Sequence, residues 1–321
     1  MLQRWLYALT TGFTFVFFSE ILFWGVRSLT DFLVTWLFYA LTAYLVLALI
    51  VRFRVNTLWS LFLVGAFYGW LTEGVVVATL YEGLPISIVN TALSWHGLIT
   101  VWVGWYAVRR ALLASTPRTA MLFGAGIGLF WGAWIPFWAF LQEPGIPPVT
   151  LARLALWVAL GVPALALSYW LQNRLTPPSF VPHRLEFGLL AGLFAVQFFT
   201  GIAPIHPMAL LVMPLLLLLA VWGLRRHLRQ ASAKPDLLLQ LAGPIPLDNL
   251  LGLLVMAPGA MLAFLLVQLL PLIPFFHYVV YLVTTLAGAL LFVLSLVKVG
   301  RPGQDHRLSP SPGLPGPADL A

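Results

Sequence analysis

Residues 206–229 read HPMALLVMPLLLLLAVWGLRRHLR, an unbroken apolar stretch that ends in a basic cluster. The stretch does not alternate between apolar and polar residues, as the strands of a transmembrane β-barrel do. Its apolar part is close to the roughly 20 residues that a helix needs to cross a hydrocarbon core about 30 Å thick. The segment is therefore predicted to be a transmembrane helix with arginines at one membrane face.

Similar apolar stretches occupy most of the remaining chain. Hydrophobic residues make up 61% of the 321 residues and charged residues only 8%, whereas a soluble domain carries roughly 25% charged residues. The sequence therefore predicts an all-α fold, a polytopic integral membrane helix bundle in contact with the lipid bilayer of the cell membrane. The ten predicted transmembrane helices lie near residues 5–25, 32–51, 57–80, 86–108, 119–141, 149–171, 186–203, 206–224, 248–270 and 275–297.

The basic residues predict how this bundle is oriented. Short cytoplasmic loops carry an excess of Lys and Arg, and 15 of the 17 Lys and Arg residues lie near the N-terminus or in alternate connections. Both termini are therefore predicted to be cytoplasmic, and the number of spans to be even. Only Arg27 and Arg153 lie toward the other side. The cytoplasmic group is Arg4, Arg52, Arg54, Arg109, Arg110, Arg118, Arg174, Arg184, Arg225, Arg226, Arg229, Lys234, Lys298, Arg301 and Arg307.

Composition also predicts the domain organisation and argues against some partners and kinds of chemistry. Residues 1–299 are predicted to form a single transmembrane domain, and the Pro/Gly-rich residues 300–321 a disordered cytoplasmic tail, because they lack apolar periodicity. The net charge of +7 sits at helix ends on one face, which indicates topology and contact with anionic lipid rather than nucleic-acid binding. The absence of cysteine excludes disulfides, thiol catalysis and thiolate metal sites.

Small residues recur every four positions in three of the predicted helices. Such spacing lets helix backbones approach closely within a bilayer, where the hydrophobic effect does not drive helices together. Packing inside the bundle is the favoured interpretation, and a homodimer joined through these glycine-rich faces is the alternative. The three sets are Gly65 and Gly69; Ala120, Gly124, Gly128 and Gly132; and Gly188 and Gly192.

Three ionisable residues at membrane depth are the candidates for chemistry: Glu20, Glu73 and His96. A charge at that depth is costly and commonly functional. Glu73 follows Gly69 by four residues and Gly65 by eight, so its carboxylate is predicted to share their face and point into a helix interface. The short connection 81–85 makes the third and fourth spans antiparallel neighbours. A hydrogen bond between Glu73 and His96 is therefore expected.

Glu20 has two interpretations. Arg27 lies about two turns farther out on the first span, so the Glu20 carboxylate can extend outward toward that guanidinium. Alternatively, Glu20 and Glu73 lie at similar depth around one polar cavity. Paired carboxylates in a low dielectric suit either a proton-coupled carrier or a general acid.

No metal and no cofactor are predicted. His206 and His277 lie near outer helix ends and could in principle complete a zinc or iron site with Glu73 and His96. The sequence contains no HExxH motif and no pair of histidines one turn apart, which are the spacings typical of such sites. The metal site is therefore the minor alternative.

No motif in the sequence identifies a reaction, so three classes of function remain. A proton-coupled secondary transporter of a small or amphipathic solute is favoured by the helix count, the proline-kinked spans and the buried carboxylates. An intramembrane enzyme that acts on a lipid or isoprenoid through Glu73 and His96 is the alternative, and an accessory membrane subunit is the third. A chamber closed at one face would favour transport, whereas a lateral opening to lipid would favour the enzyme.

Overall fold

The computed structural model describes residues 1–137, 149–175, 180–230, 234–269 and 273–300, so the predicted tail lies outside the described residues apart from Gly300. All regular secondary structure in these ranges is helical. The short elements are η3 (Thr79–Tyr81), η4 (Ile86–Ile88) and α10 (Leu237–Gln240). The long ones are α1 (Leu2–Val16) continued by η1 (Phe17–Ile21), α2 (Leu29–Arg52), α3 (Leu58–Leu71) continued by η2 (Thr72–Val76), η5 (Asn90–Ala107) continued by α4 (Val108–Leu112), α5 (Pro117–Trp134), α7 (Leu151–Arg174), α8 (Arg184–Gln197) continued by η6 (Phe198–Ile202), α9 (Ala209–Gln230), α11 (Leu247–Leu253), α12 (Met256–Leu269) and α13 (Ile273–Lys298).

The structure confirms an all-α polytopic membrane bundle. Within the described residues, eight helices are long and apolar enough to cross a bilayer. The other two predicted spans correspond to α1 with η1 and to α5. The first of these carries Arg4 and several threonines, and the predicted end of the second, at residue 141, falls outside the described residues. The count of ten therefore stays a prediction.

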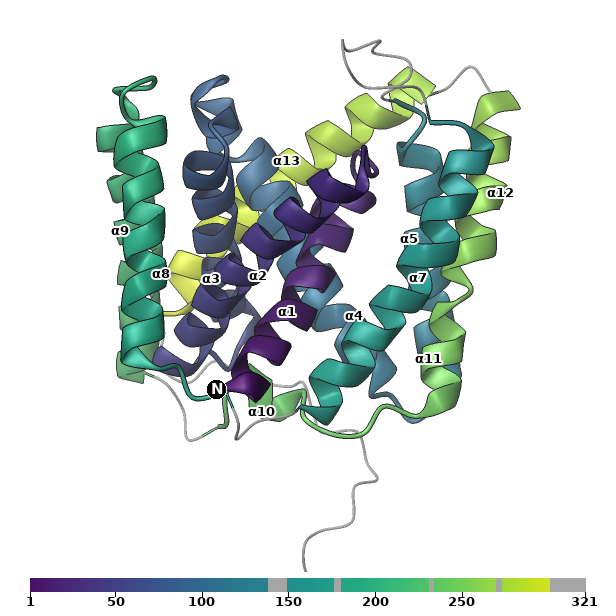
Figure 1. The fold of residues 1–321 in the computed structure, drawn as a ribbon, viewed down its shortest axis with the longest axis horizontal. Helices are drawn as coiled ribbons and strands as arrows, with labels where there is room; N and C mark the ends of the chain where they lie inside the picture. The colour runs from purple at the N-terminus through teal and green to yellow at the C-terminus, as the bar shows by residue number, and fades with distance from the viewer. Residues whose placement is uncertain (138–148, 176–179, 231–233, 270–272, 301–321) are drawn as a thin grey trace, which may run out of the picture.

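Among the eight candidate membrane spans, the one that contains α3 is the most deeply buried. In Figure 1, α8 and α9 lie on one side, α5, α7, α11 and α12 lie on the other, and α13 crosses the bundle obliquely. α1 packs against α2 and α7, and α3 packs against η5 and α9. In the α3 span 83% of the residues are buried, compared with 11% in the α13 span. Glu73, just beyond the end of α3, is therefore held in the interior of the protein.

Two of the three glycine faces are internal interfaces. A Cβ at Gly69 would collide with the backbone of Ala92 in η5, and one at Gly128 with the backbone of Met256 in α12. In contrast, in the described part of the chain no atom of a neighbouring element lies within 4 Å of a Cβ built on Gly188 or Gly192. Only the α8 face is thus left for the homodimer alternative, and nothing in the described residues supports that contact.

Gly69→Ala is expected to destabilise the protein, and Gly188→Ala is not. The first substitution inserts a methyl group into a closed backbone contact, and overpacking of this kind costs about 1–3 kcal/mol. The second adds a methyl group at an open helix surface, where alanine is favoured over glycine by up to about 1 kcal/mol. Thermal unfolding of both variants in nanodiscs measures the contrast. Equal melting temperatures of the two variants would show that the contact between Gly69 and the Ala92 backbone has room for a methyl group.

Several basic residues meet at one end of the bundle. Arg4 in α1 forms a salt bridge of 2.9 Å with Glu186 at the start of α8, and His227 near the end of α9 lies 3.2 Å from the backbone oxygen of Arg54. The start of α1 and the end of α13 lie at this same end (Figure 1). This arrangement agrees with an even number of crossings, and the assignment of this end to the cytoplasm stays a prediction.

Reporter fusions test that assignment. Because short cytoplasmic loops carry the basic excess, reporters that are active only in the cytoplasm should work at one set of positions and fail at the other. A cytoplasmic loop at Glu143 would contradict the ten-span topology. The active positions are expected after Arg54, Arg118, Lys234 and Arg301, and the inactive ones near Glu82, Glu143 and Pro204.

Candidate functional site

The candidate residues all lie in π-helical turns. In such a turn a backbone N–H bonds to the carbonyl five residues earlier, as Val77 does to Thr72 at 3.0 Å. The extra residue widens the helix and re-aims side chains, and these turns occur frequently at functional sites. Glu20 lies in η1, Glu73 in η2 and His96 in η5. Three separate helices therefore depart from α-helical geometry where they carry ionisable groups.

Glu73 and His96 form a buried pair. His96 Nε2 lies 2.6 Å from Glu73 Oε1, and the residues are only 3% and 8% exposed, respectively. The hydroxyl of Thr79 donates to the second carboxylate oxygen. The contact expected from the glycine spacing is thus present, because Gly69 brings α3 close to η5. A buried carboxylate with partners on both oxygens can hold a charge that would otherwise be too costly.

The other nitrogen of the imidazole ring contacts a cluster of hydroxyl groups. His96 Nδ1 lies 2.9 Å from Ser19 Oγ. Ser19 Oγ lies in turn 2.8 Å from Thr100 Oγ1 and 3.2 Å from the Tyr68 hydroxyl. Hydroxyl groups donate and accept, so the cluster can adjust to either tautomer of His96 and to its protonated form. Ser19, Tyr68 and Thr100 were not among the predicted site residues.

Glu20 lies beside this cluster and contacts it through a tyrosine. The Tyr39 hydroxyl donates to Glu20 Oε1, and the Tyr39 ring centroid lies 6.4 Å from that of His96 and 6.1 Å from that of Tyr68. No salt bridge joins Glu20 to Arg27, both of which the structure describes. Glu20 is therefore oriented by α2 rather than by Arg27.

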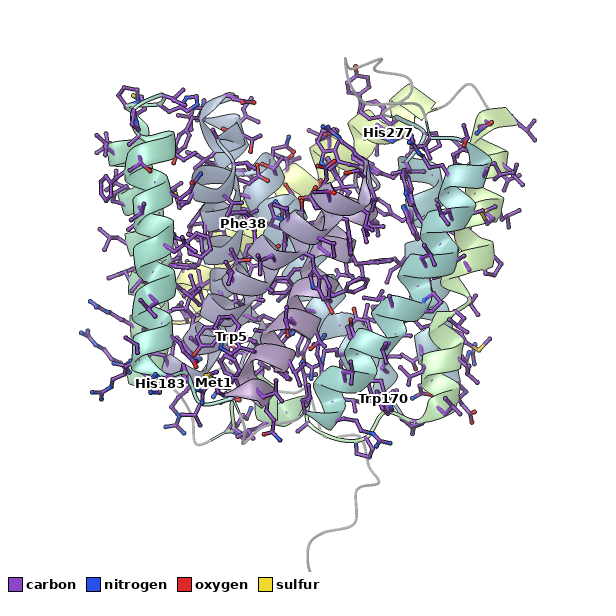
Figure 2. The ribbon with its side chains drawn as sticks, viewed as in Figure 1. Met1, Trp5, Phe38, Trp170, His183 and His277 are labelled. Atoms are coloured by element: carbon purple, nitrogen blue, oxygen red, sulfur yellow. The ribbon has the colours of Figure 1, made fainter. Side chains whose placement is uncertain are left out.

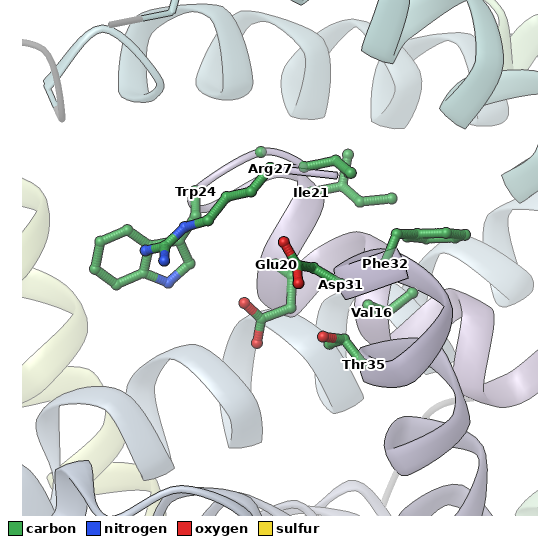
Figure 3. Close-up of a pocket in the computed structure, with 10 residues that line it drawn as sticks. Val16, Glu20, Ile21, Trp24, Arg27, Asp31, Phe32 and Thr35 are labelled. Atoms are coloured by element: carbon green, nitrogen blue, oxygen red, sulfur yellow. The ribbon is translucent and has the colours of Figure 1, made fainter. Parts of the chain in front are cut away.

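Glu20 also lines a pocket at the end of α1 that is opposite to the N-terminus. The pocket has a volume of about 300 Å³. Figure 3 shows Glu20 from η1, Asp31 and Thr35 from the start of α2, and Arg27 from the connection between the two helices. The lining contains neither Glu73 nor His96; it consists of Val16, Glu20, Ile21, Trp24, Gly25, Val26, Arg27, Asp31, Phe32 and Thr35. Glu20 and Tyr39 thus stand between the pocket and the buried pair.

The connection after η2 covers the pair from one side. The Tyr81 hydroxyl donates to the backbone oxygen of Gly74 at 2.8 Å, and the ring of His206 stacks on the Tyr81 ring at a centroid distance of 5.4 Å. Burial raises the pKa of Tyr81 to about 12, so its hydroxyl remains a hydrogen-bond donor at neutral pH. These contacts hold Thr79 against Glu73.

The structure does not bring the four residues of the alternative metal site together. His277 Nε2 lies 2.6 Å from the backbone oxygen of Trp134, and the His277 ring stacks on the Phe137 ring at a centroid distance of 3.9 Å. Figure 2 labels His277. His206 is held against Tyr81. Among the described residues, no three metal-ligating side chains gather at one point.

A second pocket is almost entirely apolar and opens between α2, α3, α8 and α9. Its volume is about 340 Å³, and its wall includes Leu71 and Val75, which lie two residues before and two residues after Glu73. Two of its lining residues, Phe187 and Phe199, are exposed on the surface of the bundle. Glu73 itself is not in the lining. The lateral pocket is therefore separate from the polar site.

Comparison with protein-family models, with curated proteins and with solved structures finds no match to this chain. What is shown is a polytopic helical membrane protein.

Proposed function

We propose that this protein is a proton-coupled secondary transporter of a small amphipathic solute in the cell membrane. The observation that carries the proposal is the buried Glu73–His96 pair, which is joined to a hydroxyl cluster and approached from a pocket at one end of the bundle. Ionisable residues inside a membrane protein commonly mark proton or substrate pathways. Glu73 and His96 carry the proton in this proposal, and Glu20 exchanges protons between the pocket and the pair.

Coupling follows from the low dielectric around the pair. Glu73 and His96 are in direct contact, so the uptake of one proton changes the charge of the whole buried site by one unit. A conformational equilibrium shifts when a ligand binds one state better than the other. Protonation of the pair is expected to favour one access state, and binding of a solute in the Glu20 pocket the other.

The pocket also suggests a class of solute. Its wall presents the indole of Trp24 and the ring of Phe32, together with the carboxylates of Glu20 and Asp31 and the guanidinium of Arg27 (Figure 3). A volume of about 300 Å³ is at the lower end of small-molecule sites. A compact solute with one apolar part and one polar part would use both kinds of wall.

An intramembrane enzyme is the second candidate, and the lateral apolar pocket is the observation that favours it. An acyl or isoprenoid chain could occupy that pocket, with Leu71 and Val75 in contact with it. A reacting group would then have to reach Glu73 and His96, which the pocket does not expose. The other pocket, in contrast, contains Glu20 in its wall, so transport is the better supported function.

Proteoliposomes can test the proposal before the solute is identified. Vesicles with an imposed pH gradient are incubated with a defined mixture of amines, amino acids, organic acids, nucleosides and sugars, and mass spectrometry identifies the solutes that accumulate. Vesicles that contain the wild-type protein should accumulate at least one solute, and a protonophore should abolish this accumulation. No gradient-dependent accumulation, combined with chemical conversion of an added polyprenyl lipid, would instead establish the enzyme.

A further inference from the structure

A second buried polar layer lies between α1 and α7, on the other side of the hydroxyl cluster from the pocket. Thr10, Thr11 and Thr14 of α1 are buried, as is Gln172 of α7. At 100° per residue the three threonines occupy one face of α1 together with Tyr7. Hydrogen bonds between threonine and glutamine side chains are common where helices pack inside a membrane, so the polar atoms of this layer that remain without a partner are the ones that require a reason.

Two oxygen atoms in this layer lack a hydrogen-bond partner among the described residues. The Gln172 amide nitrogen donates to Thr14 Oγ1 at 2.9 Å and to the backbone oxygen of Thr10 at 3.2 Å. Gln172 Oε1 and Thr11 Oγ1 are buried, and the described part of the chain offers them no partner. Leaving such a group unsatisfied costs about 1–3 kcal/mol, and internal water commonly satisfies such groups.

The polar layer continues toward the N-terminal end of α1. The fully buried guanidinium of Arg109 donates to the Tyr7 hydroxyl at 3.0 Å. Two other nitrogens of Arg109 donate to Asn173 Oδ1 at 3.1 and 3.2 Å. Asn173 follows Gln172 directly along α7. Polar groups therefore line α1 from Tyr7 to Thr14 and resume at Ser19.

Phe18 is one of the buried aromatic side chains between the two polar layers. Phe18 follows Thr14 by four residues, is 1% exposed and packs directly against Gly104 of η5. Tyr169 of α7 donates to the Gly104 backbone oxygen at 2.6 Å, which holds α7 against the same point. Thr14 and Ser19 are about 7.5 Å apart along the helix axis, and Phe18 lies within this interval of the chain.

We propose that Thr10, Thr11, Thr14 and Gln172 form a water-binding site that is the second half of the proton route, and that Phe18 closes the route in this state. This inference rests on the proposed transport function. A water molecule held by Gln172 Oε1 and Thr11 Oγ1 passes a proton by accepting one and releasing another, so each hydroxyl and water is unchanged after transfer.

A leak measurement in proteoliposomes tests the route without any solute. Vesicles contain a pH-sensitive dye, a pH gradient is imposed, and valinomycin with potassium clamps the membrane potential. Phe18→Ser should produce a proton leak at least several-fold above wild type, because the serine and added water bridge Thr14 and Ser19. Vesicles with the Gln172→Leu variant should show no proton leak above wild type. Vesicles with the Phe18→Ser/Gln172→Leu double variant should also show none, because the second half of the route is then interrupted.

Two controls isolate these effects. Phe62→Ser removes a fully buried ring of α3 that packs on Trp102, so it should destabilise the fold to a similar degree while it leaves the residues between α1 and α7 unchanged. Gln268→Leu applies the second substitution to an exposed side chain. If Phe18→Ser does not fold, Phe18→Ala replaces it.

The outcomes separate this inference from the transport proposal. A folded Phe18 variant without a leak, or a leak that persists after Gln172→Leu, would overturn the second half-route even if Glu73-dependent solute uptake is found. A leak that depends on both Phe18 and Gln172 would support the route even if no solute uptake is found, and the transport proposal would then fail alone.

Discussion

Glu73→Gln is expected to reduce solute uptake driven by a pH gradient to the level of protein-free vesicles, while the protein stays folded and inserted. The amide keeps one oxygen that can accept from His96, and its NH2 group can donate to the Thr79 hydroxyl, so both partners of the carboxylate stay paired. The amide cannot take up a proton, so the carboxylate–imidazole unit no longer exists as a proton carrier. Uptake of the solute identified in the mixture, measured at matched protein density, gives the result.

Glu82→Gln is the matched control for this substitution. Glu82 lies nine residues farther along the chain and is exposed, so the same chemical change there should leave uptake within the error of wild type. Solute uptake at the wild-type level in vesicles with Glu73→Gln would show that Glu73 is not needed for proton coupling. Loss of folding in the Glu73 variant would show that its carboxylate is mainly structural.

The second large effect concerns stability. Glu73→Leu and His96→Leu should each lower the free energy of unfolding by about 3–5 kcal/mol, because each leaves a buried partner without its counterpart. The double variant should lose less than the sum of the two, because both members of the pair are then absent. Contacting residues typically show coupling energies of about 0.5–3 kcal/mol.

Thermal or denaturant unfolding in nanodiscs measures this cycle. Combining Glu73→Leu with Val297→Leu, an exposed site in α13, provides a reference cycle that should be additive. Additive losses for Glu73 and His96 would mean that the 2.6 Å contact contributes nothing specific. The two residues would then be separate structural groups.

The sequence predicted the membrane fold and the central contact for simple physical reasons. Long apolar runs have few structural solutions in a bilayer, so the all-α bundle followed from composition. Gly65, Gly69 and Glu73 share one helical face, and only a short connection separates their helix from that of His96. These two facts were enough to place the carboxylate near the imidazole.

The surroundings of the pair could not be predicted in the same way. Ser19, Tyr39 and Tyr68 are ordinary residues in transmembrane helices, and their roles depend on contacts between helices that are far apart in sequence. The π-helical turns also depend on tertiary packing and have no simple sequence signal. For the same reason, the hydrogen-bond partner of Glu20 could not be predicted: its carboxylate lines a pocket together with Arg27 and accepts a hydrogen bond from Tyr39.

Proton movement during solute uptake is the most direct test of the transport proposal. The identified solute is added to dye-loaded proteoliposomes that start without a pH gradient, and the internal pH is followed. With the wild-type protein, the internal pH should change in proportion to solute uptake. With Glu73→Gln, neither solute uptake nor a change of internal pH should occur. Solute uptake that leaves the internal pH constant in the wild type, or a pH change that persists in Glu73→Gln, would contradict proton coupling through the Glu73–His96 pair.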